Sequence, residues 1–423
     1  MSQEFVQFVG AVVVAAVTVQ VLLMLATTVR RYAADNEANR LSLQVLRLRA
    51  DAALANHRWA NDTAEFGWNG IRKFEIDRKV PEIDGVHSFY LLPHDGKKLP
   101  PFLAGQFLTF ELNIPGEMKP VIRCYSLSDS PHKDYYRVSI KKIPPPRDDP
   151  GGRPGLSSTF FNDVLQQGDI VNVKAPSGHF HLQPQRNLPI VLIGGGIGIT
   201  PVMSMLNTLC DEEHRGEVWF FLGVRNSREH AMKENLEAVA QAFDNVNLRI
   251  CYSNPLDDDV AGRDYHHTGY VGVDLFKEML PSNNYVFYIC GPPPMMESLT
   301  SGLYDWGVPE ERVHFEAFGM ATVKKAAKPD TATEAAEQTE CVITFERSGK
   351  TLTWTESEGS LLDLAEKFGV SMNFACRTGN CGTCMTAIKE GDVDYLVKPG
   401  YEVEKGSCLA CIGIPKGALT LDA

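Results

Sequence analysis

Residues 373–392, NFACRTGNCGTCMTAIKEGD, decide the fold of the C-terminal part of the chain. They contain a C-x4-C-x2-C array made by Cys376, Cys381 and Cys384. Iron–sulfur clusters are held by four thiolates, three of which can come from one loop with this spacing. Gly379 and Gly382 suit such a loop, because its backbone needs angles that a Cβ disfavours. The array therefore predicts an iron–sulfur site.

The fourth thiolate has two candidates, Cys408 and Cys411, which lie together in GSCLACIGIP. Structural zinc is the competing use of these cysteines, since zinc favours two C-x2-C pairs. Cys381 with Cys384 and Cys408 with Cys411 could formally supply those pairs. That pairing leaves Cys376 without a role, so iron–sulfur is the preferred interpretation.

Two local patterns precede the array. ECVITFERSGKTLTWTESEG predicts a β-hairpin with Ser348 and Gly349 at its turn. SLLDLAEKFGV predicts a helix, with Ser360 as its N-cap and Gly369 just beyond its end.

Residues 340–423 resemble the plant-type ferredoxin domain appended to a class of bacterial oxygenase reductases. The resemblance implies a β-grasp fold that binds a 2Fe–2S cluster. In those reductases the cysteine shortly before a final x-x-P is the ligand. The resemblance thus implies Cys408 as a spare thiol and a metal-ligand set of Cys376, Cys381, Cys384 and Cys411.

Length and charge limit the classes of function. A chain of 423 residues accommodates two or three domains with full cores. Its net charge of −12 argues against nucleic acid as a partner, because a phosphate-binding surface needs a basic excess. Ten cysteines, five of them within residues 376–411, favour metal ligation in a reducing compartment over disulfides.

The N-terminal residues 1–30 predict a single transmembrane anchor. No charged side chain occurs from Phe5 to Val29, and a helix of that length, about 37 Å, spans a lipid bilayer. A cleaved signal peptide is the alternative, but it needs a basic start that MSQEF lacks. Arginines follow the span, so we expect a single-pass protein of the cytoplasmic membrane with its catalytic domains in the cytoplasm.

Residues 31–65 are rich in helix formers and predict a helical stalk. The stalk could continue the membrane helix, lie on an anionic leaflet through its arginines, pack on a partner, or pack on its own domain. The sequence does not separate these alternatives.

The remainder of the chain divides into two regions that differ in their pattern of apolar residues. Residues 66–186 contain short alternating runs split by glycine and proline, which predict an antiparallel barrel. Residues 187–319 alternate apolar strands with helices, the rhythm of a doubly wound parallel sheet. Residues 320–339, MATVKKAAKPDTATEAAEQT, predict a linker.

The barrel carries a flavin signal in RCYSLSDSP, where Arg123, Tyr125 and Ser126 form R-x-Y-S. A tyrosine ring can stack on isoalloxazine, an arginine can neutralise the flavin phosphate, and a hydroxyl can bond near the flavin N5. The R-x-Y-S pattern is similar to the flavin signature of the ferredoxin–NADP reductase superfamily. The G-x-S-S helix start at Gly155 resembles that of the pyrophosphate-binding members, which implies FAD rather than FMN. The further predicted flavin-binding residues lie in VSIKK and GLSSTFFND, where the second segment leads into a phosphate-binding helix start: Val138, Ile140, Lys141, Gly155, Leu156, Ser157 and Ser158.

A pyridine-nucleotide signal follows in LPIVLIGGGIGITP, a glycine-rich turn between a strand and a helix. Glycines let the backbone approach a pyrophosphate, and the helix N-terminus favours its charge. YICGPPPMM follows about ninety residues later, after another apolar strand. The two segments resemble the GGxGxxP and CGPxxM pair of the superfamily, which implies nicotinamide near Cys290. The implied nucleotide-binding residues are Gly195, Gly196, Gly198, Thr200, Pro201, Gly291, Pro292 and Met295.

Four more residues complete the predicted site. In FEAFG, Phe318 is the candidate aromatic over the open flavin face, as the resemblance implies, and Glu316 either assists there or is solvated. Ser126, Cys290, Glu316 and Phe318 are the predicted catalytic residues.

Arg225 and Arg228 in GVRNSREH lie where relatives contact the adenosine ribose, and an arginine there would favour NADPH. Glu229 would suit NADH, which is the weakly favoured cofactor.

Taken in order, the motifs of residues 66–423 resemble the reductases of phenylacetyl-CoA epoxidase and related oxygenases. That resemblance implies electron flow from NADH or NADPH through FAD to a 2Fe–2S cluster, and on to a redox protein acceptor. The anchor favours a membrane-associated acceptor such as an oxygenase, hydroxylase or desaturase. A subunit that feeds quinone is the second interpretation, although the sodium-pumping NADH:quinone reductase puts its ferredoxin domain first. A non-catalytic assembly or redox-sensing subunit is the third.

Overall fold

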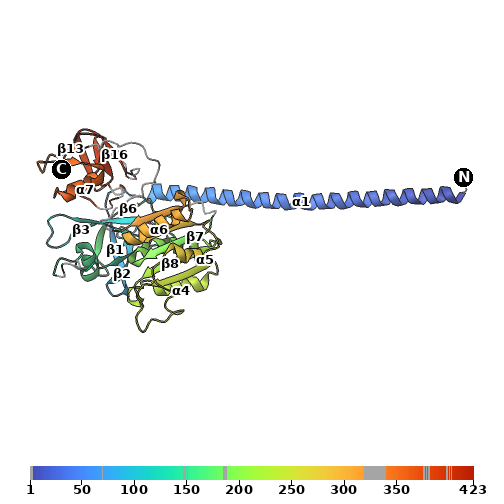
Figure 1. Cartoon of the computed structure of the whole chain (residues 1–423), viewed down its shortest axis with the longest axis horizontal. Coiled ribbons are helices and arrows are strands. Elements are labelled where there is room, and N and C mark those ends of the chain that lie inside the picture. The colour runs from blue at the N-terminus through green and yellow to red at the C-terminus, as the bar shows by residue number, and fades with distance from the viewer. Residues whose placement is uncertain are drawn as a thin grey trace. The chain divides into compact units, whose positions relative to one another are not determined.

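The chain forms two units in the computed structural model, Met1–Glu65 and Phe66–Ala423 (Figure 1). The structure describes residues 3–68, 70–145, 149, 151–183, 188–318, 340–374, 377, 379, 382–396, 399, 401 and 403–423. The predicted linker of residues 320–339 lies outside the described residues.

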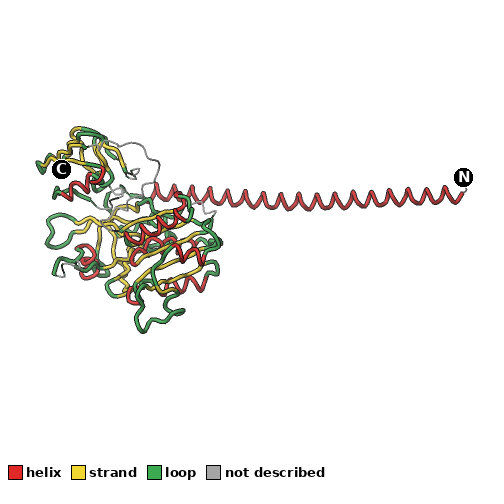
Figure 2. The backbone as a smooth tube through the Cα atoms, viewed as in Figure 1, coloured by secondary structure: helices red, strands yellow, loops and turns green. Residues whose placement is uncertain are grey.

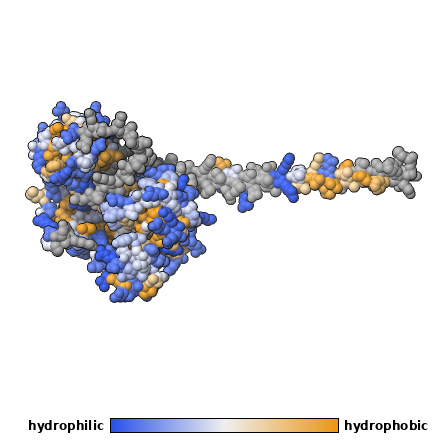
Figure 3. All heavy atoms as spheres, in the orientation of Figure 1, coloured by the Kyte–Doolittle hydropathy of each residue, from blue (hydrophilic) through white to orange (hydrophobic). Residues whose placement is uncertain are grey.

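The first unit is built on one helix, α1 (Gln3–Phe66), of 64 residues (Figure 2). The predicted stalk is therefore a continuation of the N-terminal helix. Hydrophobic side chains are exposed along its N-terminal part, including Val17, Leu22 and Leu25 at 54%, 59% and 57% (Figure 3). The predicted transmembrane anchor is not confirmed, because no helix within the described residues is both long and apolar enough to cross a membrane. Many side chains of the predicted span before Ala15 lie outside the described set.

The second unit begins with a barrel of six antiparallel strands, as predicted. Its sheet order is β4-β3-β6-β1-β2-β5. The strands are β1 (Arg72–Ile83), β2 (Val86–Pro93), β3 (Phe107–Leu112), β4 (Val121–Ser126), β5 (Tyr136–Lys141) and β6 (Ile170–Ser177). An antiparallel bridge between Leu127 and Val138 joins the end of β4 to β5 and closes the sheet. Phe74, Phe89 and Phe110 fill the interior with no exposed area.

A parallel sheet follows, with order β10-β9-β8-β7-β11-β12. Its strands are β7 (Ile190–Gly195), β8 (Val218–Val224), β9 (Val246–Tyr252), β10 (His267–Thr268), β11 (Val286–Gly291) and β12 (Val313–Ala317). The helices are α3 (Ile199–Asp211), α4 (Lys233–Ala242), α5 (Val273–Met279) and α6 (Pro293–Asp305). Residues of α3 and α4 pack into one core cluster and residues of α5 and α6 into another, so the sheet is covered on both faces as predicted.

Helix α4 starts later than its sequence predicts. The pattern EHAMKENLEAVAQAF favours a helix from Glu229, whereas the structure has a short 3-10 turn at Ser227–Glu229 and begins α4 at Lys233. Met232 adopts a left-handed φ of 59°, which breaks the helical path between the two. The Asn226 side chain accepts the Arg228 N–H and caps the short turn.

The C-terminal domain is a mixed sheet of order β14-β13-β19-β15-β17, with a two-stranded pair β16-β18. Its elements are β13 (Cys341–Phe345), β14 (Lys350–Trp354), α7 (Leu361–Lys367), β15 (Met385–Glu390), β16 (Val393–Tyr395), β17 (Ser407–Leu409), β18 (Gly413–Pro415) and β19 (Leu419–Leu421). The predicted hairpin is confirmed, since Phe345 pairs with Lys350 around a turn that contains Gly349.

Helix α7 has the ends that its sequence predicts. Ser360 and Asp363 form a capping box, each side chain accepting the other's backbone N–H. At the other end Gly369 adopts a φ of 67°, and the Val370 N–H donates to the Ala365 carbonyl, as in a Schellman motif.

One hydrophobic core is shared by the barrel and the parallel sheet. Val86, Ala104 and Phe180 from the barrel side pack in the same cluster as α3 and the strands β7 and β8. Every residue of α3 from 199 to 209 is buried. The C-terminal domain instead has a core cluster of its own, drawn from residues 341–421.

Candidate functional site

Strand β4 carries the predicted flavin-binding residues at the closing edge of the barrel. Tyr125 lies edge-on against Phe161 with ring centroids 5.3 Å apart, so its ring is fixed. Its hydroxyl and the Ser157 Oγ are 2.9 Å apart. Burial raises the pKa of Tyr125 to about 12, so the phenol stays neutral at physiological pH. Arg123 is exposed and Ser126 is buried.

The Tyr125–Ser157 contact ties β4 to the start of α2 (Leu156–Thr159). A Cβ on Gly155 would lie 2.8 Å from the Ile143 Cβ, so only glycine fits there without a shift. The Ser158 Oγ accepts from the Ile143 N–H and donates to the Gly155 carbonyl. The first amides of α2 lack acceptors within the helix, so the turn offers N–H groups to a flavin phosphate.

The helix after this turn differs from the prediction. GLSSTFFND favours a continuous helix, but α2 has four residues and passes into a single π-turn, Phe160–Val164. The turn sends Phe161 into the barrel core, where it is fully buried, and the Asn162 Nδ2 donates to the Ile140 carbonyl.

Strand β5 contains three of the predicted flavin-binding residues, two with side chains inside the barrel and one with its side chain outside. The side chains of Val138 and Ile140 are 0% and 1% exposed inside the barrel, so a flavin contact by these residues would use their backbone groups. Lys141 points outward, and its Nζ lies 3.9 Å from Glu229 of the parallel-sheet domain.

The structure brings together the two predicted nucleotide motifs, which are about ninety residues apart in sequence. A Cβ on Gly198 would lie 2.3 Å from the Cys290 carbonyl oxygen, and one on Gly195 would lie 2.5 Å from the Met295 Sδ. The glycine loop therefore packs directly on the backbone of the end of β11. Gly196, in contrast, has a φ of +54° and open space where a Cβ would be. This open face fits the approach of a pyrophosphate to the backbone.

Thr200 and Pro201 lie in the first turn of α3, and both are buried. The Thr200 Oγ1 donates to the Ile197 carbonyl at 3.1 Å and so fixes the glycine loop. Pro292 is the N-cap of α6 and lies against the glycine loop, since its Cδ would be 2.8 Å from a Cβ on Gly195.

Cys290 lies in the register between Gly194 of β7 and Glu316 of β12. It is fully buried, and burial, with a smaller contribution from the Glu316 charge, raises the pKa of its thiol. Cys290 is therefore a neutral thiol and not a nucleophile. Phe315 packs into the core on the opposite face of the sheet, whereas Phe318 packs partly buried against the shared core.

The predicted ribose-binding residues form a loose charged group. Arg225 and Arg228 are exposed. Glu229 lies between two cations, 3.8 Å from the Arg225 Nε and 3.9 Å from the Lys141 Nζ. The Glu229 carboxylate therefore faces both an arginine and a lysine.

Sequence reasoning missed a buried ion pair beside the site. The Asp129 Oδ2 lies 3.3 Å from the Arg137 Nη1, with both side chains less than a tenth exposed. Asp129 also contacts α3 through Ser204 and Asn207. The only signal in the sequence is a charged residue, three positions after Ser126, in an otherwise uncharged stretch.

The described cysteines of the predicted cluster site converge. The Sγ atoms of Cys384 and Cys411 are 3.0 Å apart, and both residues are buried. Cys408 is also buried, which raises the pKa of its thiol to about 12. Cys376 and Cys381 lie outside the described residues.

Two glycines of the cysteine loop have the positive φ that the sequence predicts, 73° at Gly379 and 70° at Gly382. A Cβ at these positions would collide with Ile412 and Tyr401, respectively. Gly379 thus lies against the residue next to Cys411, and Gly382 lies against Tyr401. The described thiols of Cys384 and Cys411 are of the type that holds an iron–sulfur cluster.

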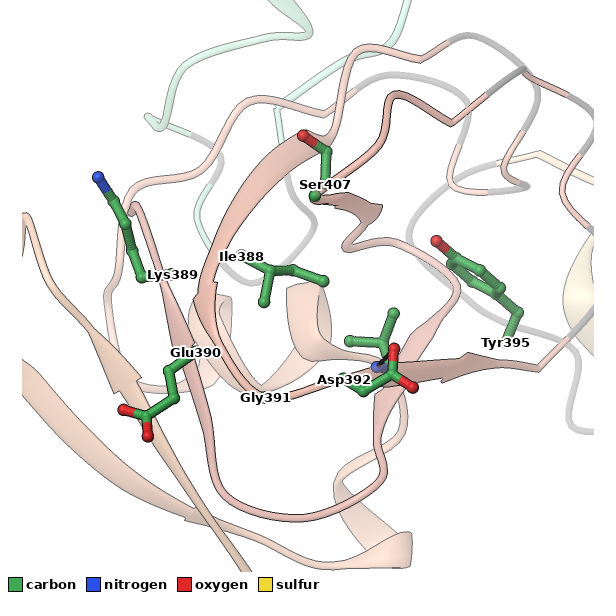
Figure 4. Close-up of a pocket in the computed structure, with 9 residues that line it drawn as sticks. Ile388, Lys389, Glu390, Gly391, Asp392, Tyr395 and Ser407 are labelled. Carbon is green, nitrogen blue, oxygen red and sulfur yellow. Dashed lines mark hydrogen bonds between the residues drawn. The ribbon is translucent and has the colours of Figure 1, made fainter.

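A separate cavity of about 390 Å³ lies in the C-terminal domain (Figure 4). Lys389 and Glu390 lie on one rim and Tyr395 on the other. None of the predicted flavin-binding, nucleotide-binding or metal-ligating residues is among the residues that line it.

Three family models match the chain. Residues 86–182 match the oxidoreductase FAD-binding domain, residues 192–301 the oxidoreductase NAD-binding domain, and residues 343–416 the 2Fe-2S iron-sulfur cluster binding domain. The protein is thus a flavin and iron–sulfur oxidoreductase, with FAD, a 2Fe–2S cluster and NADH or NADPH as its cofactors.

Curated relatives include the flavohemoproteins of Bacillus thuringiensis subsp. konkukian (strain 97-27) and Rhizobium meliloti (strain 1021). The first is 42% identical over 257 residues, which is 61% of this chain and 63% of the relative. The second is 39% identical over 254 residues, or 60% of this chain and 62% of the relative. The chain thus spans less than two thirds of the length of these relatives.

Two solved structures resemble the chain over different extents. The first is the FAD/NAD-binding domain of nitric oxide dioxygenase from Vibrio cholerae, which is 30% identical with a TM-score of 0.52. The match covers 60% of this chain and 100% of that domain. The second is phthalate dioxygenase reductase, which is 26% identical with a TM-score of 0.50. The match covers 84% of this chain and 98% of that reductase. The chain belongs to the ferredoxin–NADP reductase family, in the arrangement with FAD-binding, NAD-binding and C-terminal 2Fe–2S domains.

Proposed function

We propose that the protein oxidises NADH or NADPH and passes the electrons singly to a redox protein acceptor. The observation that carries the proposal is the presence of three carrier domains in one chain. The similarity to phthalate dioxygenase reductase, described as a modular structure for electron transfer from pyridine nucleotides to [2Fe-2S], extends over 98% of that protein. When bound, FAD converts the electron pair of the nicotinamide into the single electrons that a 2Fe–2S cluster carries.

The residues of the chain supply binding and position. The close packing of Gly198 on Cys290 holds the glycine loop and the end of β11 as one surface for the nucleotide. Tyr125 and Ser157 connect the two segments that hold the flavin. Cys384 and Cys411 bring thiolate ligands together from two distant parts of the chain.

Anaerobic titration of the full-length holoprotein with NADH tests this proposal. We expect the visible absorbance of both flavin and iron–sulfur centre to bleach, and an electron paramagnetic resonance signal of a reduced 2Fe–2S cluster to appear. Cys411→Ser should remove the paramagnetic signal but leave bleaching of the flavin, since the nucleotide and flavin residues are unchanged. A holoprotein that NADH and NADPH both fail to bleach would contradict the proposal.

We further propose that residues 1–30 anchor the protein in the cytoplasmic membrane, near a membrane-associated oxygenase, hydroxylase or desaturase. The uncharged run from Phe5 to Val29 supports this, as do the exposed apolar side chains of α1. The arginines after Val29 favour a cytoplasmic position for the remaining domains.

Fractionation of cells tests the anchor. The full chain should sediment with membranes and resist extraction by carbonate, whereas a variant lacking residues 1–30 should be soluble and still oxidise NADH. Recovery of the full chain in the soluble fraction would contradict the anchor and leave the reductase activity unaffected.

A further inference from the structure

A short segment after the flavin-binding strand lies along helix α3. The Ser204 Oγ donates to the Asp129 carbonyl at 2.6 Å, and the Asn207 Nδ2 donates to the Asp129 Oδ1 at 2.8 Å. Further along α3, Lys133 lies 2.9 Å from Asp211. The inner contacts are buried, since Ser204 and Asn207 are 0% and 8% exposed, whereas the Lys133–Asp211 pair is partly exposed.

Asp129 is held just as firmly on the barrel side. Its Oδ2 accepts from the Tyr135 hydroxyl at 3.0 Å and lies 3.3 Å from the Arg137 Nη1. The Arg137 Nε also donates to the Ser128 Oγ at 3.1 Å. A buried ion pair contributes little net stability, because desolvation offsets its attraction, but with all its hydrogen bonds made it fixes geometry.

These contacts join the two halves of the candidate site by short, rigid paths. Asp129 comes three residues after Ser126, which ends the flavin-binding strand β4. Ser204 lies on the second turn of α3, whose N-cap is Gly198 of the nucleotide-binding loop. A helix transmits a displacement along its axis, so a shift of α3 at Ser204 moves the glycine loop as well.

We propose that Asp129 is a positioning residue for hydride transfer: it holds α3, and with it the nucleotide loop, at a fixed distance from the flavin-binding strand. The inference rests on the proposed function. The donor and acceptor atoms of such a transfer must lie about 3–3.5 Å apart, and a misplacement of about 1 Å costs about 100-fold in rate. A contact that holds the flavin-binding and nucleotide-binding surfaces at a fixed distance therefore influences the rate of hydride transfer.

The test uses variants on α3, because removing Asp129 itself would leave Arg137 buried without its counter-ion. Ser204→Ala with Asn207→Ala removes both donors and leaves the ion pair intact. In the full-length holoprotein, anaerobic stopped-flow reduction by NADH should slow, by about 100-fold if α3 shifts by about 1 Å. The dissociation constant for NADH and the flavin content should not change. The deuterium isotope effect should increase, since the transfer step becomes rate-limiting.

Lys133→Ala is the matched control, because it removes a partly exposed contact between the same segment and α3. The inference is refuted if the double variant reduces its flavin as fast as this control. It is also refuted if the rate falls only in proportion to lost flavin or lost NADH affinity, which a purely structural role would produce. Failure of the wild-type protein to oxidise NADH would refute the proposed function as well, so the two failures are distinguishable.

Discussion

Replacement of Gly198 by alanine should separate the two nucleotide motifs. The new Cβ would lie 2.3 Å from the Cys290 carbonyl oxygen and 2.8 Å from the Gly291 nitrogen, both of which are backbone atoms in β11. Gly198 has a φ of −63°, so alanine causes no backbone strain and the contact alone sets the cost. An ordinary contact begins near 3.4 Å, so the loop and the strand must move apart by about 1.1 Å.

The displacement sets the size of two effects. Overpacking of this kind costs about 1–3 kcal/mol of stability, which lowers the melting temperature by about 2–12 °C. A shift of about 1 Å between the reacting groups costs about 100-fold in the rate of flavin reduction. The activity should thus fall far more than the amount of folded protein.

Anaerobic stopped-flow reduction of the flavin by NADH measures the rate, and thermal unfolding monitored by circular dichroism measures the stability. Gly272→Ala is the matched control, because Gly272 has an extended φ of −147° and no atom within 4 Å of an added Cβ. If Gly198→Ala retains its flavin and reacts with NADH as fast as Gly272→Ala, the close packing of the two motifs does not position the nucleotide.

Three further outcomes are expected. Tyr125→Phe removes the hydroxyl that contacts α2, which should weaken flavin binding by about 1 kcal/mol, measured by equilibrium titration; unchanged affinity would contradict the role of that contact. Cys411→Ser should abolish the iron–sulfur absorbance while Cys408→Ser retains it, and the reverse result would reassign the fourth ligand. Hydrogen bonding to Glu212 raises the pKa of His132. The pair therefore stabilises the folded protein fully below about pH 6.5, which is the unfolded-state pKa of histidine. The stabilisation is lost as the pH rises through the higher folded-state pKa. The stability difference between wild type and His132→Ala, below about 1 kcal/mol for this half-exposed pair, should therefore shrink from pH 6 to pH 9, and a difference that grows would contradict the assignment.

The architecture of residues 66–423 follows closely from local sequence signals. Alternation of apolar residues predicts the barrel strands, and strand–helix alternation predicts the parallel sheet. Both ends of α7 are encoded by Ser360 and Gly369, because capping depends on residues that are near in sequence. The contact between the glycine loop and β11 was also predictable, since the carboxyl ends of parallel strands lie at one edge of the sheet.

Most of the features that the sequence hides depend on contacts between distant residues. Asp129 and Asn207 are 78 positions apart, and nothing local distinguishes Asp129 from a solvated aspartate. The π-turn after α2 follows from the burial of Phe161 in the barrel, which overrides the helical pattern around it. The break before α4 needs a left-handed Met232, a residue type that rarely adopts that conformation.

The continuous core between the barrel and α3 has a consequence for how the molecule comes apart. Since Val86, Ala104 and Phe180 share one cluster with α3, unfolding of the flavin lobe should destabilise the nucleotide lobe, and the two should melt together. The C-terminal domain encloses its own apolar interior and has the attributes of an autonomous module. Evolution and engineering can therefore exchange the electron-delivering end of the chain without rebuilding the part that collects the electrons.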